Sequence, residues 1–360
     1  MRHASVRSHL IGTVRRHPSF ENQGFPAEKQ LLSHDMSPCF VNIQPVHDDT
    51  ATNTMSSAKR LAERARKARG EGDPRQARKR HKGEKSDGIR DAPPPGIAER
   101  VLAAERRMSH RLSHDLWYED PIACTYNPLV YASEAHEWYT KKFANSRKEI
   151  LLVGLNPEPL GMGQTGIPFG DISVVRDWMG LPETVSIKKP ENEHPKRPVT
   201  GLEEPLTDTS GHRLWNEWAR ATHGENPEAF FERFFVYTYC PLMFLRKSGK
   251  LISPNMIHPY ERLKVSEICD EALRAVVAAL RPRMVVGIGG WPMERSRFAL
   301  KDFVKKGMVI GSLMHPNPSS SLANPGWAEK TKKRVQELIA EMMATEDVWV
   351  NTRSGKRVRD

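Results

Sequence analysis

The sequence predicts an α/β protein in which helices cover both faces of a mostly parallel sheet. Four short apolar runs have the length and composition of buried strands. They lie at Glu149–Leu155, Phe234–Tyr239, Met284–Ile288 and Met308–Met314. Helical stretches separate these runs, and the alternation of strands with helices is typical of a parallel sheet that is buried on both sides.

Each expected helix has a recognisable apolar face or end signal. Ala98–Leu112 precedes the first strand, and Tyr260–Leu280 is the clearest, because its apolar residues recur at one-face spacing. Pro292–Lys305 begins with a proline, which suits the first turn of a helix. Trp327–Met343 closes the domain. Asp171 is a favourable N-cap residue, so a further helical segment is expected to begin there.

Composition divides the 360 residues into three parts. Residues 1–95 are expected to form a disordered basic N-terminal region and linker, residues 96–345 a globular domain, and residues 346–360 a basic C-terminal tail. A hydrophobic content of 38% suits one domain of ordinary size with additional segments. No apolar run reaches about 18 residues, so neither a membrane-spanning helix nor a membrane partner is expected.

The positive charge of the chain favours a polyanionic partner, most often nucleic acid, unless a basic tail alone supplies it. The formal net charge is +11 and the pI is near 9.5. Met1–Phe20 contains arginines but no acidic residue, as mitochondrial transit peptides do. Lys59–Lys85 is dense in Arg and Lys, which indicates a nuclear address, a DNA-gripping arm or only a solvated tail. We expect the nucleus, with the mitochondrion as the alternative.

The motifs that the chain lacks exclude several classes of site. Its cysteines are scattered without a C-x-x-C pair, so neither a disulfide framework nor a cysteine-only metal or iron–sulfur site is expected. They are Cys39, Cys124, Cys240 and Cys269. There is also no H-E-x-x-H, Walker or Ser-His-Asp pattern. We therefore predict neither a metal nor another cofactor.

A stretch rich in glycine and proline, GLNPEPLGMGQTGIPFGD, follows the first strand at residues 154–171. It has more glycines and prolines than a tight turn needs, so its backbone is expected to wrap closely around a bound group. In a parallel sheet the strand ends share one edge, where ligands bind. Asn156, Thr238 and His315 follow or end three of the strands and should converge there. An amide, a hydroxyl and an imidazole can position water and bind a flat polar ring.

Several ordered motifs of the chain resemble the single-strand-selective monofunctional uracil-DNA glycosylase family. They are NPEPLGMGQTGIPFGD with VVRDWMG after it, EHPKRPVTGLE at 193–203, and MHPNP…ANPGW at 314–327. Similarity extends upstream through Tyr126-Asn127-Pro128 and covers residues 97–345. The resemblance implies the three-layer α/β/α fold of the uracil-DNA glycosylase superfamily, with a central four-stranded sheet. It also implies base excision from DNA without lyase activity or cofactor, and we expect the protein to be a monomer.

The resemblance also assigns roles to residues of the site. Asn156 matches the asparagine that positions the attacking water, and His315 matches the histidine that hydrogen-bonds the departing base. Phe169 matches the aromatic residue that stacks on the flipped base. Residues that match the lining of the base pocket or face the base are Leu155, Met162 and Thr238.

Two further segments match parts of the family that contact DNA. The stretch from Ser248, Gly249 and Lys250 to Arg262 aligns with a DNA-contacting segment. The loop 316–326 matches the wedge that fills the gap left by the extruded nucleotide. It contains the candidate DNA-binding residues Pro316, Asn317, Pro318, Ser319 and Leu322.

Three positions depart from the family pattern. Thr238 stands where the family reads uracil with an asparagine, and Glu158 stands where it has a glycine. Serine within Ser319–Ser321 replaces the wedge arginine, which leaves Leu322 as the apolar filler. We expect Glu158 to be a solvent-facing loop carboxylate, with a role as base for the attacking water as the alternative.

The main functional interpretation is excision of uracil, or of an oxidised uracil derivative, from single- or double-stranded DNA during base-excision repair. Two alternatives remain open at this point. In the first, Thr238 directs the enzyme to another deaminated base, hypoxanthine or xanthine, because a hydroxyl cannot present the paired donor and acceptor of an amide. In the second, the chain is a DNA-binding module with weakened catalysis.

Overall fold

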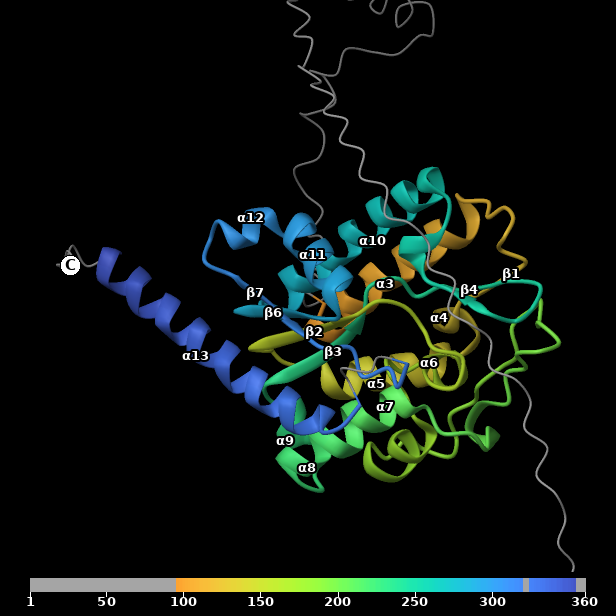
Figure 1. Ribbon diagram of the computed structural model, residues 1–360, viewed down its shortest axis with the longest axis horizontal. Coiled ribbons are helices and arrows are strands. Elements are labelled where there is room, and N and C mark those ends of the chain that lie inside the picture. The colour runs from red at the N-terminus through yellow and green to blue at the C-terminus, as the bar shows by residue number, and fades with distance from the viewer. Residues whose placement is uncertain (1–94, 320–323, 354–360) are drawn as a thin grey trace, which may run out of the picture. The chain divides into compact units, whose positions relative to one another are not determined.

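A computed structural model of the protein describes residues 95–319 and 324–353 (Figure 1). The predicted N-terminal region up to residue 94, the wedge residue Leu322 and the last residues of the predicted tail lie outside these ranges. None of the described helices is long and apolar enough to cross a membrane.

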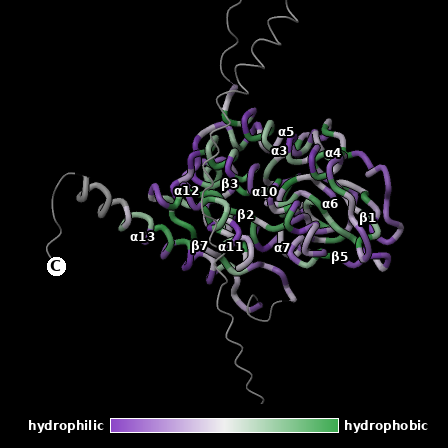
Figure 2. The backbone as a smooth tube through the Cα atoms, turned by 90° about the horizontal axis from the view of Figure 1, so that it is seen from above, coloured by the Kyte–Doolittle hydropathy of each residue, from purple (hydrophilic) through white to green (hydrophobic). Residues whose placement is uncertain are grey.

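The centre of the fold is a parallel sheet with the strand order β3-β2-β6-β7. The strands are β2 (Ile150–Gly154), β3 (Phe234–Thr238), β6 (Met284–Ile288) and β7 (Val309–Leu313). Each predicted strand agrees with the observed one to within one residue at either end. β2, β3 and β6 are buried along their whole length, which explains why they are continuous hydrophobic runs. β2 and β3 appear as hydrophobic segments in Figure 2.

Helices cover both faces of this sheet (Figure 1). On one face lie α3 (Ile97–His114), α10 (Pro259–Leu280) and α11 (Gly290–Ala299); on the other lie α9 (Pro227–Phe231), α13 (Trp327–Arg353) and the π-helical segment η3 (Arg213–Arg220). The two sides of β3 illustrate the layers, because Tyr237 bonds to Met108 of α3 whereas Phe234 packs against Trp218 of η3. The predicted three-layer α/β/α fold is confirmed.

Two predicted helices differ from the structure. The helix expected at Pro292–Lys305 is two helices, α11 and α12 (Lys301–Val304), separated at Leu300. Leu300 has φ −104° and ψ 17°, outside the helical range, and its side chain is buried in the core. The last helix, α13, continues to Arg353 instead of ending at Met343, and so passes residue 345, where the domain was predicted to end.

A second sheet, which was not predicted, consists of three short strands in the antiparallel order β1-β4-β5. The strands are β1 (Cys124–Tyr126), β4 (Met243–Leu245) and β5 (Leu251–Ile252). Strands of two or three residues are too short to show the alternation that identifies a strand. Residues of this sheet and of the neighbouring α4 form a small buried cluster of their own, with Tyr131 and Met243 among its members.

The remaining elements are short and connect these layers. They are α4 (Pro128–Tyr131), α5 (Ser133–Phe143), α6 (Met162–Thr165), η1 (Val174–Trp178), η2 (Gly201–Glu203), α7 (Thr209–His212), α8 (Ala221–His223) and η4 (Pro254–Met256). The segment expected to begin at Asp171 leads into η1, and the Asp171 carboxylate accepts a hydrogen bond from the Val174 amide (3.4 Å).

Candidate active site

The glycine-rich loop after β2 folds back on itself, and its part from Gly161 to Asp171 is buried. Its amides at Gly161 and Gly163 both donate to the carbonyl oxygen of Glu158, at 3.2 and 2.9 Å. A side chain at either glycine would collide with its surroundings: a Cβ at Gly161 would lie 2.2 Å from Oδ2 of Asp208, and one at Gly163 2.8 Å from the Glu158 carbonyl oxygen. The glycines therefore allow the loop backbone to approach Asp208 and the Glu158 carbonyl closely, whereas the predicted wrapping around a bound group stays a prediction.

Phe169 lies at the end of this loop with its ring against the last residue of β2. Its φ of 53° is left-handed, which for a bulky residue costs about 1–3 kcal/mol and requires support from the surroundings. A Cβ on Gly154 would lie 2.7 Å from Cε2 of Phe169, so the absence of a side chain at Gly154 makes room for the ring. Trp215 supports the loop by donating from Nε1 to the Pro168 carbonyl oxygen (3.1 Å). The ring is therefore fixed at the carboxyl end of the sheet.

His315 follows β7, and its ring centroid lies 6.0 Å from that of Phe169. The Asn317 amide donates to Nδ1 of His315 at 3.1 Å, so the proton of the neutral imidazole is on Nε2. Burial lowers the pKa of His315 to about 4. The residue is consequently a neutral side chain at physiological pH, with Nε2–H free to donate.

Asn156 and Leu155 follow β2 and are half-buried. Nδ2 of Asn156 donates to the Pro157 carbonyl oxygen at 3.1 Å, which orients the amide and leaves Oδ1 to accept a hydrogen bond. The carbonyl oxygen of Leu155 accepts a bond from the Cys240 amide (2.9 Å) and ties this segment to the residues after β3.

Thr238 ends β3 and pairs in register with Gly154 of β2, so both residues face the side of the sheet that carries the Phe169 ring. Its hydroxyl donates to Sδ of Met162 over 3.2 Å. Thr238 and Met162 are 6% and 2% exposed. The structure thus brings Thr238, Met162, Phe169 and His315 to the sheet edge from which Asn156 also emerges.

Two carboxyl groups flank the loop, and the sequence analysis identified only one of them. Glu158 is half-buried, and burial raises its pKa, which corrects the expectation of a solvent-facing side chain. Burial, followed by the charge of Glu158, raises the pKa of Asp208 to about 7. Oδ1 of Asp208 accepts a bond from the Ser210 amide (3.1 Å), whereas Oδ2 is buried with no partner among the described residues. Asp208 was missed because an N-cap aspartate has an ordinary structural explanation.

The loop 316–326 is held by an arginine that the sequence analysis did not identify. Arg213 of η3 donates from Nη1 to the Pro316 carbonyl oxygen (2.9 Å) and from Nη2 to Oδ1 of Asn324 (3.0 Å). Asn324 in turn donates to the Pro318 carbonyl oxygen (2.8 Å). Arg213 therefore connects the two arms of this loop on either side of the residues that the structure does not describe. No motif marked it, because the contact joins segments far apart in the sequence.

Ser319 closes the described part of the first arm. Its amide donates to Oδ1 of Asn317 at 2.8 Å, so Asn317 bonds to both His315 and Ser319. On the second arm, Nε1 of Trp327 donates to the Met314 carbonyl oxygen at 2.9 Å. The bonds at both arms place the start of the loop directly beside the His315 imidazole.

Ser248, Gly249 and Lys250 form the turn between β4 and β5, and Gly249 has the positive φ (78°) that such a turn requires. Arg197 donates to the Gly249 carbonyl oxygen at 2.8 Å and brings the 193–203 segment against the turn. Together these segments form what we call the basic hairpin surface. Its members are exposed and have no ion pair within the described ranges: Lys196, Arg197, Arg246, Lys247 and Lys250.

The basic hairpin surface is linked to the glycine-rich loop through β4. A Cβ on Gly163 would lie 3.4 Å from Sδ of Met243, so the strand packs directly against the loop. The Tyr131 hydroxyl, from the same small cluster as Met243, donates to the Gly163 carbonyl oxygen at 2.6 Å. These contacts join the surface and the loop into one packed unit.

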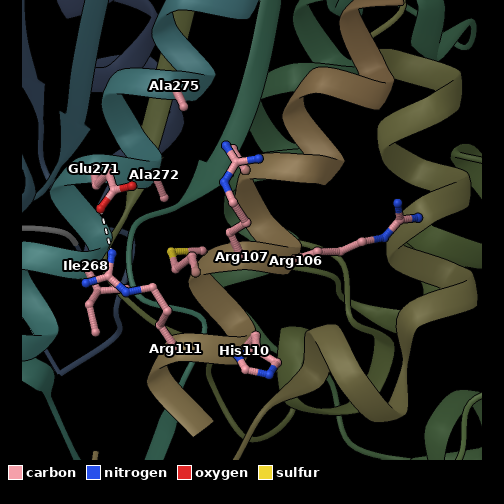
Figure 3. A pocket seen from close by; sticks show the side chains of 10 residues that line it. Arg106, Arg107, His110, Arg111, Ile268, Glu271, Ala272 and Ala275 are labelled. Atoms are coloured by element: carbon pink, nitrogen blue, oxygen red, sulfur yellow. Dashed lines mark hydrogen bonds and ion pairs between the residues drawn. The ribbon is translucent and has the colours of Figure 1, made fainter. Parts of the chain in front are cut away.

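A separate cavity of about 370 Å³ lies between α3 and α10 (Figure 3). Arg106, Arg107 and Arg111 stand at its rim, and Arg111 pairs with Glu271 at 2.5 Å. It contains none of the candidate site residues, so we do not assign it to the active site. Within the residues that the structure describes, no three His, Cys, Asp or Glu side chains are arranged to hold a metal ion.

Comparison with known proteins gives a consistent set of relatives. No protein-family model matches the chain. Over 242 residues it is 42% identical to a protein of Rattus norvegicus described as single-strand selective monofunctional uracil-DNA glycosylase, and the match covers 67% of this chain and 85% of that protein. The Mus musculus protein of the same description matches equally, and the Bos taurus protein is 42% identical over 245 residues, 68% and 88% of the two chains.

A search of solved structures also finds a match. The crystal structure of wild-type Pedobacter heparinus SMUG2 aligns with a TM-score of 0.48 at 20% identity, covering 68% of this chain and 97% of that chain.

Proposed function

The chain belongs to the single-strand-selective monofunctional uracil-DNA glycosylase family, and we propose that it hydrolyses the N-glycosidic bond of uracil in DNA, leaving an abasic site for base-excision repair. The observation that carries this proposal is the meeting of Phe169 and His315 at the sheet edge beside Asn156. Neither a shift to hypoxanthine or xanthine nor a purely DNA-binding role is favoured, because these relatives are described as uracil-DNA glycosylases.

Phe169 is the stacking surface for the extruded base. A glycosylase must take its target out of the helix, which costs a few kcal/mol of unstacking and unpairing. Stacking on a preplaced aromatic ring offsets part of this cost. The strained backbone of Phe169 and its contact with Gly154 support the role, because they keep the ring in one position before DNA binds.

His315 stabilises the leaving group. As the glycosidic bond breaks, the sugar becomes positively charged and the base leaves as an anion, so a donor directed at a base carbonyl oxygen acts where charge develops. The Nε2–H tautomer and the low pKa of His315 support this role, since a neutral donor is present without any change of protonation. Removing one such donor typically lowers the rate about 10²–10³-fold.

Asn156 positions the attacking water. Its amide is held by the bond to the Pro157 carbonyl oxygen, and Oδ1 is left to accept a hydrogen bond from water. Because the sugar cation is strongly electrophilic, the water needs correct placement more than it needs a strong base. Leu155 and Met162 line the same pocket.

DNA is held by the basic hairpin surface, whose exposed cations suit phosphates, and by the loop 316–326, which occupies the gap in the base stack. We propose action on both single- and double-stranded DNA by a monomer. We also propose a nuclear location, directed by Lys59–Lys85. Imaging a fluorescent fusion of residues 1–95 tests the location, and mitochondrial signal would contradict it.

The central test uses single-stranded and duplex oligonucleotides that carry one deoxyuridine, followed by alkali to cleave abasic sites. We expect cleavage by the wild type and a loss of at least about 100-fold for Asn156→Ala. Asn192→Ala, which changes an exposed asparagine outside the site, is the matched control and should cleave normally. No cleavage by the wild type, or equal cleavage by Asn156→Ala, would refute the assignment.

A further inference from the structure

The position that faces the base at the end of β3 is a threonine, and its hydroxyl is already engaged. Thr238 donates to the thioether sulfur of Met162 over 3.2 Å. Sulfur is a weak acceptor, but within the described part of the chain it is the acceptor that this hydroxyl contacts. With Thr238 6% and Met162 2% exposed, little water reaches the pair to compete for the proton.

The direction of this bond determines what the hydroxyl can offer to a ligand. A threonine hydroxyl has one proton and two acceptor lone pairs. Because the proton points towards Met162 Sδ, the oxygen presents only acceptor capacity to the pocket. Thr238 pairs with Gly154, against which the Phe169 ring lies, so the hydroxyl belongs to the strand end beside the ring on which the base is proposed to stack.

Uracil and cytosine differ at the ring nitrogen on this edge. Uracil carries a hydrogen on N3 and is a donor there, whereas neutral cytosine has a lone pair on N3. An oxygen that can only accept would form a hydrogen bond with N3–H of uracil. With cytosine, its lone pair would instead face the lone pair on N3, and the two would repel each other. In a buried site an unmatched polar group is disfavoured strongly, which makes such a contact selective.

We propose that Thr238 and Met162 act together as the uracil reader of this enzyme: Met162 Sδ holds the hydroxyl proton, and Thr238 Oγ1 accepts the N3–H of the flipped uracil. The proposal rests on the proposed function and explains how the site distinguishes uracil from cytosine without the family asparagine. Thr238 touches the base, whereas Met162 acts through Thr238 by fixing its hydroxyl.

The test measures binding, so it does not depend on catalysis. Oligonucleotides carry 2′-fluoro-2′-deoxyuridine or 2′-fluoro-2′-deoxycytidine, whose electron-withdrawing fluorine opposes formation of the sugar cation and leaves the base attached. Their dissociation constants are measured for the wild type, Met162→Leu, Thr238→Val, Thr238→Ser and the double variant Met162→Leu/Thr238→Val. Thermal unfolding of each variant establishes that it is folded.

We expect the wild type to prefer the uracil analogue. Met162→Leu frees the hydroxyl to turn and donate to cytosine N3, so the preference should fall about tenfold. Thr238→Val should weaken uracil binding by a similar factor, Thr238→Ser should keep the preference, and Met162→Leu should change nothing further in the Thr238→Val background.

An unchanged preference in Met162→Leu or in Thr238→Val would overturn the inference, as would a wild type that does not distinguish the two analogues. If Met162→Leu does not fold, the two Thr238 variants test the inference. Loss of the preference for the uracil analogue in Thr238→Val, with its retention in Thr238→Ser, supports the inference, and any other result overturns it. Cleavage of ordinary deoxyuridine is assayed in parallel. If the wild type binds the uracil analogue selectively but does not cleave, the proposed function alone is refuted. If the wild type cleaves but these substitutions leave its base preference unchanged, the proposed role of Thr238 and Met162 alone is refuted.

Discussion

The backbone amide of Asn317 donates a hydrogen bond to Nδ1 of His315, and this contact fixes which imidazole nitrogen carries the proton. The loop that is proposed to enter the base stack therefore also sets the tautomer of the residue that is proposed to stabilise the departing base. A shift of the loop that breaks this bond would leave the imidazole free to adopt the other tautomer.

The first prediction concerns the protonation of His315. Because burial lowers its pKa to about 4, the imidazole is neutral throughout the range from pH 5.5 to 8. His315→Ala should therefore lower the single-turnover excision rate by about 10²–10³-fold to the same extent at every pH in this range. His110→Ala, at an exposed position of α3, is the control. A ratio of wild-type to variant rates that changes tenfold across this range would contradict a neutral donor.

The second prediction concerns the contact of Arg213 with both arms of the loop 316–326. Arg213→Ala should lower uracil excision from duplex DNA about tenfold or more, with a smaller loss on single strands, because only the duplex requires the loop to replace a stacked base. Arg220→Ala changes another arginine of the same π-helical segment, one that pairs with Glu225, and should have little effect. Equal losses on both substrates would argue against a role in extrusion.

The third prediction concerns the space for the Phe169 ring. Gly154→Ala places a Cβ 2.7 Å from this ring and should displace it, which lowers excision about tenfold or more. Gly290→Ala, where an added Cβ meets nothing within 4 Å, is the matched control. Single-turnover kinetics measure both, and wild-type activity in Gly154→Ala would show that the ring position is not critical.

The fourth prediction concerns the basic hairpin surface. Replacing Lys247 and Lys250 with Glu should weaken DNA binding and reduce the slope of log affinity against log salt by about 0.9 for each lost phosphate contact. Excision from saturating DNA should change little. Lys301→Glu with Lys306→Glu makes the same charge change at exposed positions in α12 and just after it, and serves as the control. An unaltered salt slope would exclude this surface from DNA binding.

The fifth prediction concerns the pH dependence of stability. Because the pKa of Asp208 rises from 3.8 to about 7 on folding, the folded state holds a proton that the unfolded state has lost, so stability falls as pH rises from about 4 to 7. The full effect is about 4 kcal/mol at 1.36 kcal/mol per pH unit. His315 acts in the opposite direction between about pH 4 and 6.5, because its pKa is lowered on folding.

The contribution of Asp208 is therefore isolated by comparison with Asp208→Asn. Urea unfolding at several pH values should give a difference between the two proteins that shifts in favour of the variant as pH rises towards 7.5. A difference that does not depend on pH would mean that Asp208 is already charged at low pH in the folded protein.

The sequence predicted the central sheet accurately because β2, β3 and β6 are buried on both faces and are hydrophobic throughout. It also predicted that Thr238 and His315 would reach one edge, since strand ends in a parallel sheet converge. It did not predict the break at Leu300, where burial of one side chain overrides a helical pattern.

Contacts between segments far apart in the chain could not be predicted from the sequence. The bonds of Arg213 to the loop arms join residues more than 100 positions apart, and periodicity carries no information about such pairs. The same holds for the hydroxyl of Thr238, whose direction depends on Met162 and not on its neighbours in the sequence. The residue types of the site were therefore predictable, whereas the orientation of their protons was not.

The packing of Met243 against Gly163 has a consequence for the spacing between a bound phosphate and the extruded nucleotide. Since the basic hairpin surface and the base pocket belong to one packed unit, the distance between a bound phosphate and the extruded nucleotide is constant. If this surface binds phosphates as proposed, the enzyme contacts the strand at a set number of nucleotides from the extruded base. A uracil closer to a strand end than this spacing lacks the gripped phosphate, so removing terminal nucleotides one at a time should produce an abrupt loss of affinity at one length.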